Sequence, residues 1–169
     1  MRTLLLIFSF AFLSCGALGQ QAQPGQTPRS DAVATRGDHV MGFSHDAATH
    51  HFYLFGDGGE IVVTANLSDY ASTRDQIRLH LGHIAKMFTS GNFNAPMIIH
   101  DTNPPGTATM ARRKEQIRYE FSEVDLGAKI RIIATNPETV DATHAFLLFQ
   151  ILDHHTGDSP VISADHTTK

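Results

Sequence analysis

Two stretches of the chain share the same order of hydrophobic and polar positions. The first reads HFYLFGDGGEIVVTAN followed by LSDYASTRDQIRLHLGHIAKMF, and the second reads IRYEFSEVDLGAKIRIIATN followed by PETVDATHAFLLFQILDHH. In each stretch, apolar residues alternate on both sides of a short polar turn, which predicts two strands joined as a hairpin. Apolar residues three or four positions apart then predict a helix. The sequence therefore predicts two ββα units.

The turn and cap residues agree with this pattern. Glycines at 56–59 and 125–127 suit tight hairpin turns, and Asn136 followed by Pro137 is typical of a helix start. A single ββα unit cannot bury its apolar face alone. We therefore expect an α+β fold in which two ββα repeat units form a mostly antiparallel four-stranded sheet with two helices on one face. The segment 91–111, rich in proline and glycine, is expected to be a long ordered loop between the units.

The two ends of the chain differ from this core. Residues 1–19 contain one basic residue, an apolar run and a small-x-small end, which is the pattern of a secretory signal peptide and too short for a membrane span. We expect residues 20–41 to be a flexible linker, 42–158 a single domain and 159–169 a disordered tail. The protein is then secreted or periplasmic without a transmembrane segment, and a lipid anchor at Cys15 is the alternative processing.

Composition excludes several kinds of function. Cleavage after Gly19 leaves no cysteine, so disulfides, thiolate metal sites and a cysteine nucleophile are excluded. The formal charge of −4 leaves no basic surface, and we expect no nucleic-acid partner. The sequence has no phosphate-binding glycine loop, no G-x-S-x-G elbow and no H-E-x-x-H motif. Histidine, carboxylate, methionine, hydroxyl and amide groups remain as the source of chemistry.

Histidine is abundant, with 11 residues in 169, and imidazole is the commonest protein ligand of late transition metals. On the first predicted helix, His80 and His83 lie at the edge of the apolar stripe, and Met87 adds a soft ligand that would favour copper. On the second predicted helix, His144 lies among apolar residues and His154 lies near the end. These helices therefore present imidazoles at the border of the core.

The first strand and the connecting loop add two more candidates. His51 aligns with Ile117 of the second repeat, so we expect His51 to face the helices and His50 to face away from them. His100 follows an apolar run and is expected at the rim of the core. The candidate ligands for copper or zinc are therefore His51, His80, His83, His100, His144 and His154. Each has a structural alternative, in which the ring packs at the core boundary and its polar tip stays in water.

The stretches HLGHIAKMF and THAFLLFQILDHHTGD resemble segments of uncharacterised secreted proteins of environmental bacteria, over roughly residues 50–158. The resemblance implies a bacterial origin and no established activity. From the residues, the first hypothesis is a secreted His-rich metal-binding protein whose partner is a metal ion or a small molecule. The alternative is a non-enzymatic ligand- or protein-binding domain with structural or pH-responsive histidines. A third is a small hydrolase or oxygenase that uses the same ligands with an open coordination position.

Overall fold

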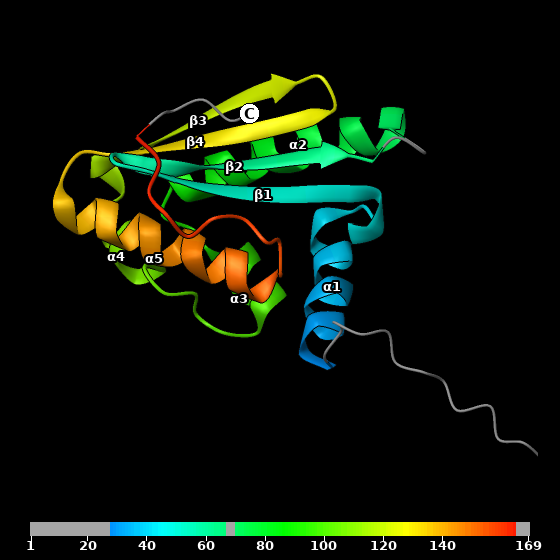
Figure 1. Ribbon diagram of the computed structural model, residues 1–169, viewed down its shortest axis with the longest axis horizontal. Coiled ribbons are helices and arrows are strands. Elements are labelled where there is room, and N and C mark those ends of the chain that lie inside the picture. Colours follow the sequence, from blue (N-terminus) through cyan, green and yellow to red (C-terminus); the bar gives the residue numbers. More distant parts are fainter. Residues whose placement is uncertain (1–27, 67–69, 165–169) are drawn as a thin grey trace, which may run out of the picture.

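A four-stranded antiparallel sheet forms the centre of the computed structural model, which describes residues 28–66 and 70–164 (Figure 1). The strands are β1 (Ala48–Phe55), β2 (Gly58–Ala65), β3 (Ile117–Val124) and β4 (Gly127–Ala134), and they lie in the order β1-β2-β4-β3. Helix α2 (Tyr70–Thr89) packs against β2, β3 and β4, and α5 (Pro137–Asp153) packs against β1, β2 and β4. The predicted α+β fold is confirmed, and the order β1-β2-α2 and β3-β4-α5 follows the predicted repeat.

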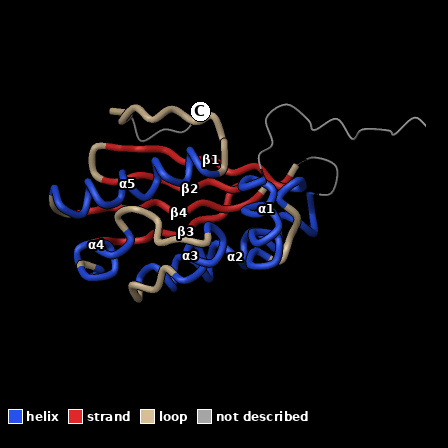
Figure 2. Tube along the Cα trace, turned by 90° about the horizontal axis from the view of Figure 1, so that it is seen from below, coloured by secondary structure: helices blue, strands red, loops and turns tan. Residues whose placement is uncertain are grey.

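Three more α-helices and two short 3-10 turns complete the described chain. Figure 2 shows the helices in front of the strands when the molecule is seen from below. The additional elements are α1 (Pro28–Met41), η1 (His45–Ala47), α3 (Asn94–His100), α4 (Thr107–Arg112) and η3 (Lys114–Gln116). Among the described residues, no helix has the length and apolar character needed to cross a membrane.

The two hairpins have the same dimensions. Each strand has eight residues, and Phe55 pairs with Gly58 across one two-residue turn as Val124 pairs with Gly127 across the other. Only glycine fits at position 59, because a Cβ atom there would lie 2.3 Å from the carbonyl oxygen of Tyr53. Turn length fixes the register of a hairpin, and the register decides which side chains face the helices.

The core lies between the inner face of the sheet and helices α2 and α5. The apolar stripe of α2 is buried there, as its spacing predicts, together with Phe146 and Leu147 of α5. Helix α5 begins at the predicted cap: the side-chain oxygen of Asn136 accepts from Thr139 N at 3.1 Å, and Thr139 Oγ1 accepts from Asn136 N at 3.4 Å.

Three predictions about connecting segments are wrong within the described residues. Residues 28–41 belong to helix α1 and not to a flexible linker; Val33 is buried, and Arg36 Nε donates to Ile99 O at 2.7 Å. The segment 91–111 contains helices α3 and α4. The tail is ordered as far as Ala164, because Ser163 N donates to Leu54 O at 2.8 Å along the outer edge of β1. The expected signal peptide, Cys15 and residues 165–169 lie outside the described residues.

Candidate functional site

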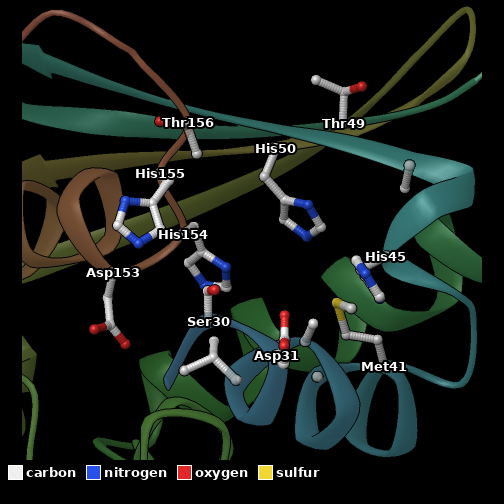
Figure 3. Close-up of a pocket in the computed structure, with 14 residues that line it drawn as sticks. Ser30, Asp31, Met41, His45, Thr49, His50, Asp153, His154, His155 and Thr156 are labelled. Atoms are coloured by element: carbon white, nitrogen blue, oxygen red, sulfur yellow. The ribbon is translucent and has the colours of Figure 1, made fainter. Parts of the chain in front are cut away.

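Two adjoining cavities lie on the helix-covered side of β1. The outer cavity, about 340 Å³, lies between α1, the start of β1 and the end of α5 (Figure 3). The inner cavity, about 80 Å³, reaches into the apolar core towards α2 and α3. Met41, His50 and His154 line both cavities, so they form the wall between them.

Four histidines from four different parts of the fold line the inner cavity. They are His50 of β1, His80 of α2, His100 of α3 and His154, which caps α5. The rings of His50 and His154 are stacked, with centroids 5.7 Å apart and planes 2° from parallel. The ring of His100 meets that of His154 edge-on at 4.9 Å. In Figure 3 the ring of His50 extends from β1 towards α1.

Three of these rings are neutral at pH 7. Burial, followed by the neighbouring His80, His51 and His45, lowers the pKa of His50 to about 4. Burial also lowers the pKa of His80 to about 4, with a contribution from His83. For His154, burial and then His50 and His100 lower the pKa to about 3, against the opposing effect of Asp153. Desolvation disfavours the imidazolium form, and nearby imidazoles add to that effect.

The same three rings have no hydrogen-bond partner within residues 28–66 and 70–164, and each of them packs against another aromatic ring. His80 meets Phe43 edge-on at 5.9 Å, and His154 stacks on Phe52 at 5.8 Å. All three side chains are half-buried, and each lines a cavity. The nitrogens of His50, His80 and His154 are therefore available to a molecule or ion in the cavities.

His100 differs because both of its ring nitrogens are occupied. Its Nδ1 lies 2.6 Å from Asp153 Oδ2, and its Nε2 lies 2.9 Å from Gln150 Oε1. Asp153 also accepts from Arg29 Nε at 2.8 Å and from Arg29 Nη2 at 3.2 Å. Burial alone would raise the pKa of Asp153, but hydrogen bonds from Arg29 and His100 outweigh it and lower that pKa. Asp153 thus fixes the ring that packs against His154 and ties α1 to the end of α5.

The structure brings together three of the six predicted ligands, His80, His100 and His154. His51 is not among them. It lies on the opposite face of β1, where its Nδ1 is 2.8 Å from Asp158 Oδ1, and His50 lines the inner cavity. The predicted orientation of this histidine pair is therefore wrong.

The error has a simple geometric cause. Because both hairpins have eight-residue strands and two-residue turns, Ala48 corresponds to Ile117, and His50 corresponds to Tyr119. The alignment that matched His51 to Ile117 was shifted by three residues. An odd shift exchanges the two faces of a strand.

His83 and His144 also lie outside the cluster. His83 is exposed on α2 and borders a groove beside β3. His144 Nε2 donates to the carbonyl oxygen of Phe55 at 2.8 Å, at the far end of β1. The angular positions of His80 and His83 on a helical wheel did not show which edge of the apolar stripe faces the cavity and which faces solvent. The tertiary contact of His144 has no local signature in the sequence.

The predicted ligand set did not include four residues of the site, which are His50, Gln150, Asp153 and Met41. The hairpin length pointed to His50, and the position of Asp153 beside His154 in the sequence suggested that it could orient a histidine. Among the described residues, no three His, Cys, Asp or Glu side chains converge as a ready-made metal site. In comparisons with known proteins, no family model, no curated protein and no solved structure matches this chain. We therefore base the functional proposal on the chemistry of the histidine cluster.

Proposed function

We propose that the histidine cluster binds a transition-metal ion, copper or zinc, with His50, His80 and His154 as ligands. The observation that carries the proposal is that three neutral imidazoles without a hydrogen-bond partner in the described chain line adjoining cavities. Neutral imidazole is the form that binds these ions. Met41 lines both cavities, and a thioether favours cuprous copper.

The ring separations support this assignment. When two imidazoles bind one ion at about 2.0–2.1 Å, their ring centroids lie about 5–6 Å apart. His50 and His154 are 5.7 Å apart. Their parallel planes do not aim both nitrogens at one point, so binding turns the rings about their Cβ–Cγ bonds. The site therefore assembles on binding and is not preformed.

The protonation state of the three rings also supports the proposed metal site. A proton competes with the metal for each ring nitrogen. Burial has already lowered the pKa of all three rings to about 4 or below, so this competition is absent at neutral pH. The proposal includes export from the cytoplasm, because the expected leader and the thiol-free remainder of the chain suit an oxidising compartment.

Metal titration of the full chain, purified without a histidine tag, tests the proposal. We expect one Cu(I) or Zn(II) ion per chain, measured by competition with a chelating indicator. His50→Phe and His154→Phe keep a ring of similar size and should weaken binding by more than about 100-fold, since loss of even an outer-shell partner costs 10–100-fold. The matched control is His83→Phe, because His83 is exposed and lies outside the cluster.

Two results would reject the metal site. One is the absence of stoichiometric binding by the parent protein. The other is equal affinity in the parent, His50→Phe and His154→Phe proteins, which would place the bound ion elsewhere.

A second candidate is a small organic ligand in the outer cavity. Its volume of about 340 Å³ lies within the range of known ligand pockets, roughly 300–1,000 Å³. Val33, Ala34 and Met41 give it an apolar wall, and Asp31 and Asp153 give it negative charge. A small amine with an apolar body suits this lining. Benzylamine added to metal-free protein should then raise the melting temperature, and His83→Phe should keep that response.

A further inference from the structure

The two edge strands of the sheet differ in what covers them. At the end of β1, Ser163 forms an isolated bridge with Phe55 and donates its N–H to Leu54 O, which covers that part of the edge. The other edge is β3, and no segment of residues 28–66 or 70–164 pairs with its outer side. Figure 2 shows β3 at the margin of the sheet, opposite β1. An uncovered edge strand is a template for another strand.

The backbone of β3 has free hydrogen-bonding groups on that edge. Thr135 N donates to Gln116 O, and Ala134 N donates to Asp57 O on the opposite side of β4. Hydrogen bonds alternate along an antiparallel pair, so the even-numbered residues of β3 pair with β4. The N–H and C=O groups of Tyr119 and Phe121 therefore point outward, as does the C=O of Ile117, whereas Ile117 N donates to Lys114 O.

Apolar surface borders the same edge. A groove of about 650 Å³ runs between α2 and β3. It includes Phe121, which is 38% exposed, and Leu79, which is 77% exposed. Tyr119 also lines the groove, and its buried hydroxyl has no hydrogen-bond partner in the described chain. Backbone groups and apolar side chains are thus uncovered at one place, next to the buried hydroxyl of Tyr119.

We infer that two copies of the chain form a symmetric dimer by antiparallel pairing of β3 with β3. The two-fold axis passes through Tyr119, perpendicular to the sheet. In this register Arg118 of each copy lies opposite Glu120 of the other, on the outer face. An axis at Arg118 or at Glu120 would instead place identical charges opposite each other, which destabilises a strand pair. The charge pattern therefore favours the axis at Tyr119 over those at Arg118 and Glu120, and its self-complementarity indicates a second copy as the occupant.

The interface is isologous, since each copy contributes the same surface. Arg118 and Glu120 already contact each other within one strand at 2.8 Å, and pairing lets each also meet its opposite in the second copy. Helix α2 packs against β3 and β4, so the two α2 helices come side by side beneath the joined sheet. Leu79 and Phe121 are then covered. The dimer leaves the histidine cluster untouched and does not depend on its function.

Charge reversal gives a sharp test by sedimentation equilibrium of the full chain. Arg118→Glu and Glu120→Arg each replace two attractive cross-strand pairs by two repulsive ones and should raise the dissociation constant by about tenfold or more. The double variant R118E/E120R restores complementarity and should dimerise like the parent. An equimolar mixture of the two single variants should form a heterodimer. Both side chains are exposed, at 67% and 51%, so folding should be unaffected.

The control is Asp141→Arg, an exposed charge on α5, which should leave dimerisation unchanged. A parent protein that is monomeric at about 100 µM would overturn the inference, because mass action favours any specific dimer there. So would a dimer equally stable in the two single variants, which would place the interface elsewhere. Metal titration of the same variants should match the parent, so failure of the metal site and failure of the dimer are distinguishable.

Discussion

Acid should destabilise the metal-free protein, and His154→Phe should remove a defined part of that sensitivity. His154 caps α5 and packs against His50 of β1 and His100 of α3, beside Asp153 and His155. Phenylalanine can keep the stacking on Phe52 and His50 without a titratable nitrogen. The perturbation therefore changes protonation and keeps most of the packing.

The magnitude follows from linkage between protonation and folding. In the unfolded chain this imidazole titrates near its ordinary pKa of 6.5, whereas in the folded protein the pKa is about 3. A folded pKa below the unfolded one means that its contribution to stability is present above pH 6.5 and is lost as the pH falls towards 3. Between pH 7 and pH 5 the unfolded chain takes up about 0.7 proton at this ring and the folded protein almost none. The free energy of unfolding then falls by about 2 kcal/mol.

His50 and His80 add similar effects with the same sign, because burial lowers each pKa to about 4. The three rings together remove about 5 kcal/mol between pH 7 and pH 5, a large share of the roughly 5–15 kcal/mol of a typical domain. Urea unfolding with a chelator present, at half-unit steps between pH 7 and pH 5, measures this loss. In His154→Phe the loss should be smaller by about 2 kcal/mol. In the control His83→Phe the loss should equal that of the parent. Equal loss in His154→Phe and the parent would refute the reasoning.

Two further predictions concern the scaffold. Asp153→Asn should lower the free energy of unfolding at pH 7 by about 1.5–3 kcal/mol, because Asp153 accepts from both Arg29 and His100. Arg29→Ala should have a smaller effect, because the Arg29 side chain is exposed. Equal losses for the two variants in urea unfolding would contradict a role for the contact between Asp153 and His100. Gly59→Ala should lower stability by roughly 1–3 kcal/mol, because its Cβ would lie 2.2 Å from Leu147 Cδ1. Gly56→Ala has no atom within 4 Å of its Cβ and should be nearly neutral, so thermal melting of the pair checks the packing.

The sequence predicted those elements whose signals are local. Alternation and hairpin turns located the four strands, and the Asn136 cap located the start of α5. Helix α1 was not predicted from the sequence, because Val33 is the only one of its apolar residues that is fully buried. Its position depends on contacts from Arg29 to Asp153 and from Arg36 to Ile99, more than sixty residues away. Such contacts have no signature in a single polar segment.

The site was predictable only in part for the same reason. Three of the candidates, His80, His100 and His154, converge because they lie on elements that face one cavity. The abundance of histidine and its position at the edge of the apolar stripe could suggest this part of the site. Which of His50 and His51 faces the helices depends on the register of the hairpin, and the length of its turn sets that register. The locked state of His100 depends on Asp153 and Gln150, both 50 or more positions away in the chain. Neither fact can be read from the periodicity of one strand or helix.

The internal repeat provides an argument that the cluster serves a function beyond packing. Position 50 in the first unit corresponds to Tyr119 in the second, and Tyr119 packs against Phe88 in the core with its ring edge-on at 5.7 Å. An aromatic ring of that kind satisfies the fold at this place in the sheet. The first unit instead has an imidazole whose pKa is lowered to about 4 and whose nitrogens lack a partner in the described chain. Packing alone requires only an aromatic ring at this position, and Tyr119 meets that requirement although its buried hydroxyl has no hydrogen-bond partner in the described chain. We therefore propose that the histidine at this position, joined by His80 and His154 from two other elements, serves ligand binding in addition to packing.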